Sequence, residues 1–267
     1  MKITFGAKIP EKKDIATVSI RKEKDSAVFL LPSGQKEIRI GVPEPEKMTR
    51  RKLVNLARQA IALAKANKTK KLAVSFSEFE FQKSGVRGGG LAELLAVNFE
   101  MANFEFVAYK TKPPEGWNFV EEIAVVGKVS AEVKKGFSRG QIIGRGVNAE
   151  RVLANTPGGE MTPRVLAREA RRAVQGTRVK VKTLGLKEIK KLKMGGILGV
   201  ARGSAEEPQF IILEYRGGPK KEKPIVLIGK GITFDSGGLM LKPGKYMTDM
   251  HLDMSGGAAV IHAVVLA

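Results

Sequence analysis

A short apolar run near the end of the chain constrains the fold more than any other feature. Ile225 to Ile228 are four consecutive branched aliphatic residues between Pro224 and Gly229. Such a run is typical of a strand that is buried on both faces, and these strands occur mostly in parallel sheets covered by helices. The run therefore predicts an α/β sheet. Ligands of such sheets bind beyond the carboxyl ends of the strands, so Lys230 is expected at a functional position.

Two carboxylates and two lysines gather in the glycine-rich segment that begins there. Asp235 precedes the pair Gly237-Gly238, and Lys242 and Asp253 follow before a helix-like run over residues 257–267. Carboxylate oxygens suit hard divalent cations, and the chain has no cysteine for a thiolate site. A lysine amine ligates a metal only when it is neutral, which an adjacent cation promotes by lowering its pKa. The pattern indicates metal-assisted hydrolysis by two ions roughly 3.5–4 Å apart, with a protonated lysine that polarises the substrate carbonyl.

Other sites fit this segment less well. A phosphate-binding loop, G-x-x-x-x-G-K-[ST], requires glycine where Pro224 stands and serine or threonine where Gly231 stands. A Ser-His-Asp triad would use Ser236, but the surrounding residues lack G-x-S-x-G, and the only histidines are His251 and His262. The plainest interpretation makes the aspartates turn residues and the lysines solvated. It suits each residue singly, but not the four together with the glycines.

The run GKGITFDSGGLMLKPGKYMTDMHLDMSGGAA, residues 229–259, resembles the signature of the leucyl (cytosol) aminopeptidase family. These are dinuclear metal exopeptidases that remove N-terminal residues from peptides. The resemblance implies that Lys230 and Asp235 are metal ligands, with Asp235 touching both ions, and that Asp253 is a ligand of one ion. By the same resemblance, Lys242 would hold the substrate oxygen that becomes the gem-diolate. The resemblance to the family covers residues 155–267 well and the N-terminal portion only in general character.

The resemblance also implies cofactors and partners. The cofactors would be two divalent metal ions, Mn²⁺ or Zn²⁺, with Mg²⁺ or Co²⁺ also accepted; the substrates would be peptides, and the assembly a homo-hexamer. In the family, a later segment adds an aspartate, a glutamate and an arginine that holds a bicarbonate base. Here the sequence stops at Ala267 inside an apolar run without a capping glycine, a polar last turn or a proline. We therefore expect a fragment of a longer enzyme, with an incomplete metal site and no activity alone.

The charge of the chain supports an alternative function. Its net charge is +20, from 47 basic and 27 acidic residues. The counts balance from Lys230 onward, so the excess lies upstream, for example in residues 68–71 and 190–193. A surface of this kind could bind nucleic acid through phosphate contacts, as some members of the resembled family do, and the chain would then be a catalytically inactive basic binding module. Solvated lysines explain the charge more simply, because aromatic residues make up only 6% of the chain.

Length and composition predict a soluble cytoplasmic protein with about two domains. The 267 residues include no cysteine, no apolar segment typical of a signal peptide, and no apolar run long enough to span a membrane. We expect a mixed α/β N-terminal domain over residues 1–130 and a linking helix over residues 131–154. Residues 155–267 should form the first part of an α/β aminopeptidase catalytic domain.

Periodicity predicts the individual elements. In the first domain, strands are expected at residues 2–5, 37–40, 72–76, 104–109 and 123–126, and helices at residues 53–64 and 91–101. The glycine loop before the second helix, residues 84–90, is interpreted as a flexible turn rather than a phosphate site. Residues 144–149 match G-x-G-x-x-A but follow no strand, so they carry little weight. Beyond them, Thr162 and Pro163 should begin a helix, residues 178–183 and 210–215 should be strands, residues 186–193 a short helix, and residues 195–200 should lead into a strand.

Overall fold

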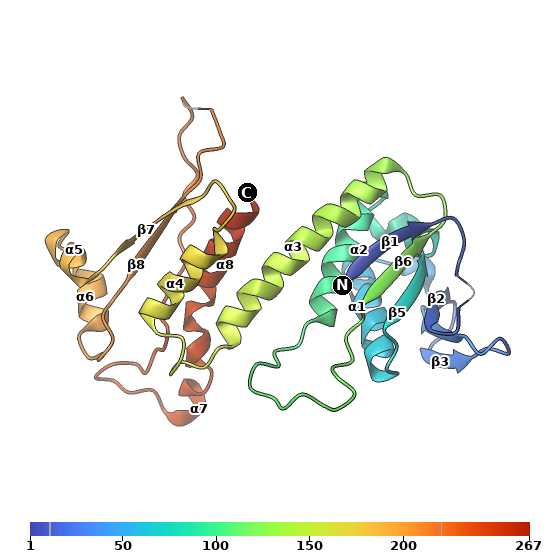
Figure 1. The fold of residues 1–267 in the computed structure, drawn as a ribbon, viewed down its shortest axis with the longest axis horizontal. Helices are drawn as coiled ribbons and strands as arrows, with labels where there is room; N and C mark the ends of the chain where they lie inside the picture. The colour runs from blue at the N-terminus through green and yellow to red at the C-terminus, as the bar shows by residue number, and fades with distance from the viewer. Residues whose placement is uncertain (11, 220) are drawn as a thin grey trace. The chain divides into compact units, whose positions relative to one another are not determined.

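The computed structural model describes residues 1–10, 12–219 and 221–267 (Figure 1). The chain divides into two compact units, Met1–Arg145 and Gly146–Ala267. The division falls inside α3 (Ala131–Asn155), within the range that the sequence assigns to a linking helix. The domain limits at residues 130 and 155 remain predictions. Both units mix helices with strands, as the α/β assignment requires.

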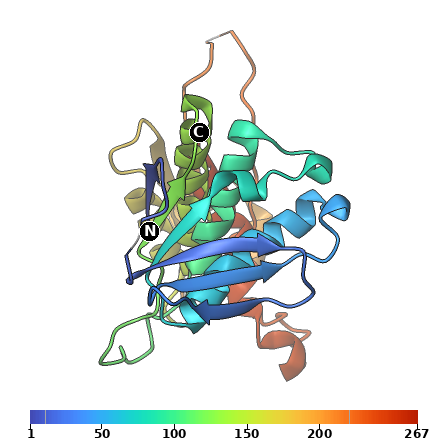
Figure 2. The same cartoon turned by 90° about the vertical axis from the view of Figure 1, so that its right-hand side faces the viewer.

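Six strands form the sheet of the first unit, in the spatial order β1-β6-β5-β2-β4-β3. They are β1 (Lys2–Gly6), β2 (Ile15–Arg21), β3 (Ala27–Leu30), β4 (Lys36–Gly41), β5 (Lys71–Ser75) and β6 (Glu122–Val126). Neighbouring strands pair in parallel, except that β3 is antiparallel to β4. Figure 2 shows the blue strands in front of the helices of this unit, which lie behind the sheet.

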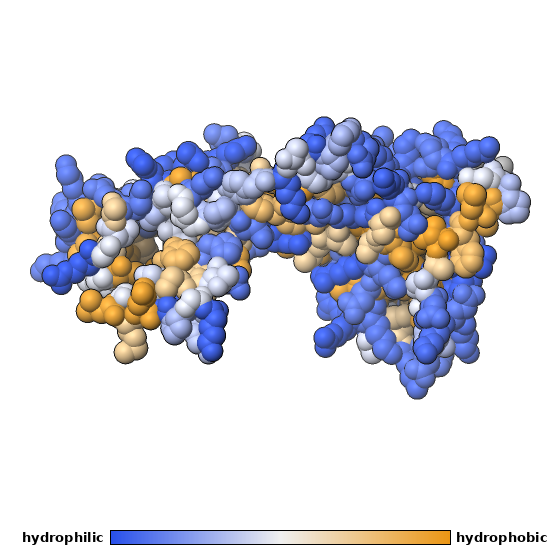
Figure 3. All heavy atoms as spheres, turned by 90° about the horizontal axis from the view of Figure 1, so that it is seen from below, coloured by the Kyte–Doolittle hydropathy of each residue, from blue (hydrophilic) through white to orange (hydrophobic). Residues whose placement is uncertain are grey.

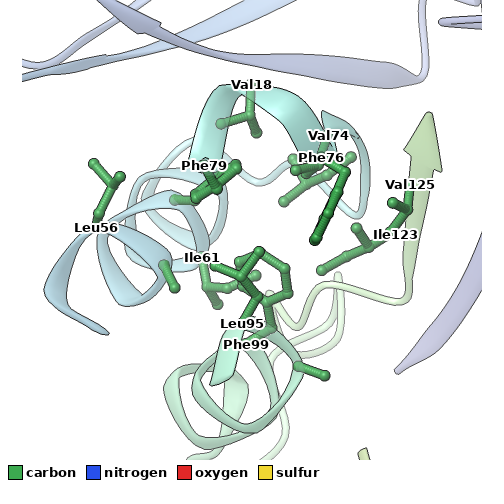
Figure 4. Packing of buried hydrophobic residues seen from close by; sticks show 14 of the residues in the cluster. Val18, Leu56, Ile61, Val74, Phe76, Phe79, Leu95, Phe99, Ile123 and Val125 are labelled. Atoms are coloured by element: carbon green, nitrogen blue, oxygen red, sulfur yellow. The ribbon is translucent and has the colours of Figure 1, made fainter. Parts of the chain in front are cut away.

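Helices α1 (Arg50–Ala66) and α2 (Gly88–Asn103) pack on the sheet through a continuous apolar interior. In Figure 4, Ile61 of α1 and Leu95 and Phe99 of α2 point toward side chains from the strands. The rings of Phe79 and Phe99 meet edge-on, with centroids 6.4 Å apart. Three short 3₁₀ helices lie in the connections: η1 (Pro45–Lys47), η2 (Phe76–Phe79) and η3 (Gln82–Ser84). Most of the buried apolar residues in the described part of the chain lie in this interior of the first unit.

Helix α1 confirms the first helix expected from the sequence. Its buried residues are the predicted ones: Leu53, Leu56, Ala57, Ala60, Ile61 and Ala64. Thr49 caps the helix, and its side chain accepts a hydrogen bond from the Lys52 backbone N–H (3.3 Å). The predicted strands at residues 2–5, 37–40, 72–76 and 123–126 are also present, as β1, β4, β5 and β6.

One strand predicted for the first unit is wrong. Residues 104–109 form no strand. Their aromatic content raises β propensity, but the segment makes side-chain contacts instead of a backbone ladder. Glu105 pairs with Lys65 of α1 at 2.5 Å, and the rings of Phe106 and Tyr109 lie 5.7 Å apart. Meanwhile β5 and β1 already pair with the two edges of β6, so no edge of β6 is left for this segment.

The glycine loop at residues 84–90 also differs from its interpretation as a flexible turn. Helix α2 begins at Gly88, so the last glycines form its first turn. The Gly89 N–H donates to the Glu132 carboxylate of α3 at 3.1 Å, which occupies the helix N-terminus with a side chain of the same unit. A Cβ at Gly89 would lie 3.1 Å from Glu132, so the small residue permits this contact.

A stripe of glycines lets α3 lie close against α2. Gly136, Gly140 and Gly144 recur every fourth residue on one side of α3, and a Cβ at any of them would overlap α2. At Gly140, for example, it would lie 2.8 Å from the Ala96 Cβ. This spacing accounts for Gly144 as a helix-packing residue, so the G-x-G-x-x-A match is not a dinucleotide loop.

The second unit has a two-stranded antiparallel sheet, β7 (Lys180–Leu184) with β8 (Phe210–Glu214). Its helices are α4 (Pro163–Ala173), α5 (Leu186–Lys191), α6 (Gly195–Ala201), α7 (Gly244–Met247), the 3₁₀ turn η4 (Met250–Met254) and α8 (Ser255–Leu266). Thr162 caps α4 by accepting from the Val165 N–H (3.3 Å), as predicted. Leu166 of α4, Ile261 of α8 and Leu213 of β8 meet in a small apolar interior. No helix in the part of the chain that the structure describes is long and apolar enough to cross a membrane.

Residues 195–200 are helical in α6, not a lead into a strand. Local hydrogen bonds, such as Leu198 N–H to the Met194 carbonyl (3.1 Å), outweigh the low helix propensity of the glycines. Leu198 also lines, with Leu186 of α5, a cavity of about 350 Å³ beside residues 204–208.

The strand predicted from Ile225 to Ile228 is not formed. These side chains are exposed, at 92% for both Ile225 and Ile228, and the structure pairs no described strand with them. An apolar run becomes a strand only when a neighbouring ladder satisfies its backbone and its faces are covered. Apolar side chains also remain on other surfaces of this unit, visible as orange patches in Figure 3; Leu239 and Met240 are among the most exposed.

Candidate metal centre

Two glycines fix the backbone that carries Lys230. A Cβ on Gly229 would lie 2.8 Å from the Gly257 Cα and would also overlap the Gly256 carbonyl. The Gly257 N–H donates to the Lys230 carbonyl at 2.6 Å. The start of α8 is therefore joined to the Lys230 loop through backbone contacts alone. The sequence placed Lys230 at the end of a strand; the structure instead positions it by this close approach.

A tight turn returns Lys242 to Asp235. Gly237 (φ +94°) and Gly238 (φ +72°) adopt left-handed conformations that glycine favours. The Gly237 N–H donates to Asp235 Oδ1 at 2.9 Å, and the Lys242 N–H donates to the Ser236 carbonyl at 2.9 Å. The Lys242 ammonium then donates to Asp235 Oδ2 at 2.7 Å. Both carboxylate oxygens of Asp235 thus have partners within the loop.

Asp253 lies in η4, immediately before α8, and faces Lys230. Its Oδ2 is 2.9 Å from Lys230 Nζ. The side chain of Asp253 is 19% exposed, whereas that of Lys230 is 57% exposed. Oδ2 itself is buried and accepts no well-oriented hydrogen bond from any described residue. A buried carboxylate is costly unless it is paired, and in this structure its cationic partner is the Lys230 ammonium.

The four predicted side chains act on one another electrostatically. The hydrogen bond from Lys242, followed by the one from the Gly237 N–H, lowers the pKa of Asp235, and the charge of Lys230 adds to this effect. The Asp253 carboxylate raises the pKa of Lys230, and the charge of Asp235 does the same. Lys230 is consequently protonated in this arrangement. The structure brings the four residues together as two ion pairs whose charges cancel.

The donor set fits divalent ions in part. Asp235 and Asp253 supply hard oxygen donors, and Lys230 supplies an amine that must lose its proton to ligate. In residues 1–10, 12–219 and 221–267 there is no group of three or more His, Cys, Asp or Glu side chains placed to hold a metal ion. The metal-ligand roles of Lys230, Asp235 and Asp253 therefore stay a prediction from the sequence.

The remaining side chains give three further results. Ser236 makes no hydrogen bond to His251 or His262 in the described structure, so no triad forms. Burial lowers the pKa of His262 in α8. Met250, which the sequence did not single out, has its sulfur 2.9 Å from Lys242 Nζ. Its position seven residues after Pro243 carries no signal in a single sequence, because the contact depends on how η4 folds back on the loop.

Comparisons with known sequences show what the second half of the chain is similar to. Residues 148–267 match the catalytic domain of the cytosol aminopeptidase family. A probable cytosol aminopeptidase of Ralstonia nicotianae is 50% identical over 124 residues, which are 46% of this chain and 24% of that protein. One of Burkholderia mallei is 41% identical over 175 residues, 65% of this chain and 34% of that protein. The chain thus spans between a quarter and a third of the length of these relatives.

Solved structures share the fold. A mutant of tomato leucine aminopeptidase superposes with a TM-score of 0.80 at 21% identity, covering 100% of this chain and 59% of that one. The bottromycin maturation enzyme BotP in complex with Mn gives 0.76 at 22% identity, covering 94% and 55%. At these identities the likeness establishes the mixed α/β fold. In sequence, residues 148–267 are similar to the catalytic domain of the cytosol aminopeptidase family.

Proposed function

We propose that this chain carries part of the active site of a metal-dependent aminopeptidase, which removes N-terminal residues of the leucine type from peptides. Lys230, Asp235 and Asp253 would hold two divalent ions, and Lys242 would contact the substrate. The observation that carries the proposal is that the structure brings two carboxylates and two lysines together, with Asp253 2.9 Å from Lys230 and Asp235 2.7 Å from Lys242. The names of the Ralstonia and Burkholderia relatives support the peptidase class, and the Mn in the BotP structure supports a divalent metal.

Each residue has a distinct part in this function. Bound divalent ions would polarise the scissile carbonyl and activate a water molecule. Asp235 and Asp253 provide the negative charge that attracts these ions, and Lys230 provides a third donor. The Lys242 ammonium would donate to the carbonyl oxygen of the scissile peptide and stabilise the negative charge that develops on it. The Gly237 N–H orients Asp235 by holding its Oδ1 at 2.9 Å.

The donor count leads us to expect weak metal binding and no hydrolysis by this chain alone. Two carboxylates and one amine fall short of the ligands that two ions require. We also propose the assembly, compartment and metals implied by the family resemblance: a cytoplasmic homo-hexamer with Mn²⁺ or Zn²⁺, or else Mg²⁺ or Co²⁺. The name cytosol aminopeptidase supports the compartment, and the hexamer rests on the resemblance alone.

Calorimetric titration of the chain with Mn²⁺ tests the proposal. Asp235→Asn and Asp253→Asn should each abolish or strongly weaken binding, because an amide oxygen carries no charge. Asp249→Asn is the matched control, since Asp249 lies in the same loop and forms no ion pair among the described residues. Equal affinity of all three variants would overturn the proposal. Leucine p-nitroanilide hydrolysis by the unaltered chain would show that its donors suffice, against our expectation.

A second candidate, nucleic-acid binding by an inactive basic module, is favoured by one helix. Helix α4 buries Leu166, Ala167 and Ala170 and exposes four arginines: Arg164, Arg168, Arg171 and Arg172. Arginines on one helix surface could contact phosphates. Fluorescence anisotropy with duplex DNA at 50 and 200 mM salt tests this idea. Binding should weaken steeply with salt and with Arg164→Ala/Arg171→Ala, and salt-insensitive binding would exclude it.

A further inference from the structure

Both carboxylate oxygens of Asp235 already accept a hydrogen bond in this structure. Oδ1 accepts from the Gly237 N–H at 2.9 Å, and Oδ2 accepts from the Lys242 ammonium at 2.7 Å. A divalent ion that binds Oδ2 would lie close to the Lys242 ammonium, and the two cations repel each other, so metal binding is favoured when a partner moves away. Gly237 is fixed by the backbone of a turn with φ +94°, whereas Lys242 reaches Asp235 through a flexible four-carbon stem. Lys242 is the partner able to leave.

We propose that Lys242 is a placeholder cation: it neutralises Asp235 in the metal-free chain, competes with the metal for Oδ2, and is released by metal binding. This inference rests on the proposed function and deepens it. The released ammonium is the group assigned above to the substrate carbonyl. Metal loading would thus make the substrate-binding lysine available, so the metal binds first and the peptide second.

The surroundings of Lys242 allow this exchange. The pair is partly exposed, with 28% of the Lys242 side chain and 33% of the Asp235 side chain accessible, so solvent screens the attraction. The only other partner of the Lys242 ammonium in the described structure is the Met250 sulfur at 2.9 Å, a weak acceptor. A doubly charged ion therefore competes against one screened ion pair and one weak contact.

Lys230 does not share this role. Its ammonium faces Asp253 Oδ2 at 2.9 Å without a well-oriented hydrogen bond, whereas Lys242 donates directly to Asp235. Lys230 is also itself an assigned metal ligand. Lys242 has no assigned role as a metal ligand, so metal binding would move its ammonium away from Asp235 rather than bind it.

Mn²⁺ affinity measured by calorimetry tests the competition. Lys242→Met removes the ammonium and keeps a side chain of similar length, so it should bind Mn²⁺ about fivefold more tightly than the unaltered chain, the size expected of one screened ion pair. Lys245→Met is the matched control: Lys245 carries the same charge three residues away but pairs with the Tyr246 ring, 4.8 Å from its centroid. Its affinity should equal that of the unaltered chain.

A second readout follows the lysine itself. Reductive ¹³C-methylation labels the lysine amines, and the NMR signal of residue 242 is the one missing from Lys242→Met. Zn²⁺ should shift this signal toward its position in metal-free Asp235→Ala, where the lysine has lost its partner. The Lys245 signal should stay in place.

The outcomes separate this inference from the proposed function. Equal Mn²⁺ affinities, or tighter binding by Lys242→Met without a Zn²⁺-induced shift of signal 242, overturn the placeholder role and leave the metal site standing. Tighter binding without the shift would mean that Lys242 weakens metal binding by charge repulsion while it stays on Asp235. If neither chain binds Mn²⁺ while circular dichroism shows both folded, the proposed metal site fails and the placeholder role fails with it.

Discussion

Lys230 and Asp253 form an ion pair in which the cation is exposed and the anion is buried: the side chains are 57% and 19% accessible, with Nζ 2.9 Å from Oδ2. Removing the lysine should therefore harm the folded chain more than removing an ordinary surface lysine. Lys230→Met leaves the Asp253 oxygen in its buried position without a cation, which lowers the free energy of unfolding. Thermal unfolding followed by circular dichroism should show a lower midpoint for this variant.

Lys245→Met is again the matched control and should unfold at the midpoint of the unaltered chain. A Lys230→Met variant with an unchanged midpoint would mean that water, rather than the lysine, stabilises the Asp253 oxygen.

Replacing a glycine by alanine should have opposite effects on stability in α3 and in α6. At Gly140 in α3 a Cβ would lie 2.8 Å from Ala96 Cβ, so Gly140→Ala should lose about 1–3 kcal/mol to overpacking, more than its helix-propensity gain of about 1 kcal/mol. At Gly199 in α6 a Cβ meets nothing within 4 Å, so Gly199→Ala should gain up to about 1 kcal/mol. Urea unfolding of both variants measures the difference. Stabilisation by Gly140→Ala would show that α3 can move away from α2 at no cost.

Glu37 should make the stability of the first unit depend on pH. It accepts from Ser19 Oγ at 2.7 Å and from Arg39 Nε at 2.8 Å. Burial raises its pKa, but these partners outweigh burial and lower the pKa below the usual 4.5. Because the pKa is depressed in the folded state, the stabilisation is complete above pH 4.5 and is lost as pH falls through the folded value. Glu37→Gln should therefore cost about 2 kcal/mol at pH 7 and progressively less below pH 4.5.

Urea unfolding at pH 7 and at decreasing pH values measures this cost. Glu44→Gln serves as the control, because Glu44 is 49% exposed and, among the described residues, its ion-pair partner is the exposed Lys47. A Glu37→Gln penalty that stays constant with pH would mean that Glu37 acts through its shape rather than its charge.

The exposed apolar run at residues 225–228 should promote self-association of the chain. Ile225 and Ile228 are each 92% exposed, so Ile225→Lys/Ile228→Lys removes apolar surface without opening a cavity. The double variant should bind less of the dye anilinonaphthalene sulfonate and self-associate less in sedimentation velocity, with unchanged unfolding behaviour. A fall in stability would contradict the exposed position, because it would mean that these side chains pack inside the fold.

Structural features that depend on nearby residues could be predicted from the sequence. The apolar face of α1 and the Thr162 cap of α4 depend on periodicity or on a local hydrogen bond, and the structure confirms them. The predicted strands β4 and β6 are also present, because each finds partner strands in the sheet. Residues 104–109, 195–200 and 225–228 were predicted as strands or as leading into one, and these predictions were wrong. A strand depends on a partner far away in the sequence, which an apolar run cannot specify.

The candidate site shows the same limit. The sequence named Lys230, Asp235, Lys242 and Asp253, and the structure brings them together. It did not say which lysine faces which aspartate, because the pairing follows from the turn at Gly237 and from the approach of the Lys230 loop to α8. The metal-ligand roles remain predictions until metal binding is measured.

The contact of Gly229 with Gly256 and Gly257 has a consequence for how such chains can diverge. Since a Cβ on Gly229 would overlap the Gly256 carbonyl, the residues on both sides of this contact cannot gain side chains independently. Mutational drift through this loop is therefore restricted by space as well as by chemistry. A related chain that kept every charged residue but replaced Gly229 would have to shift α8, and Asp253 with it, away from Lys230.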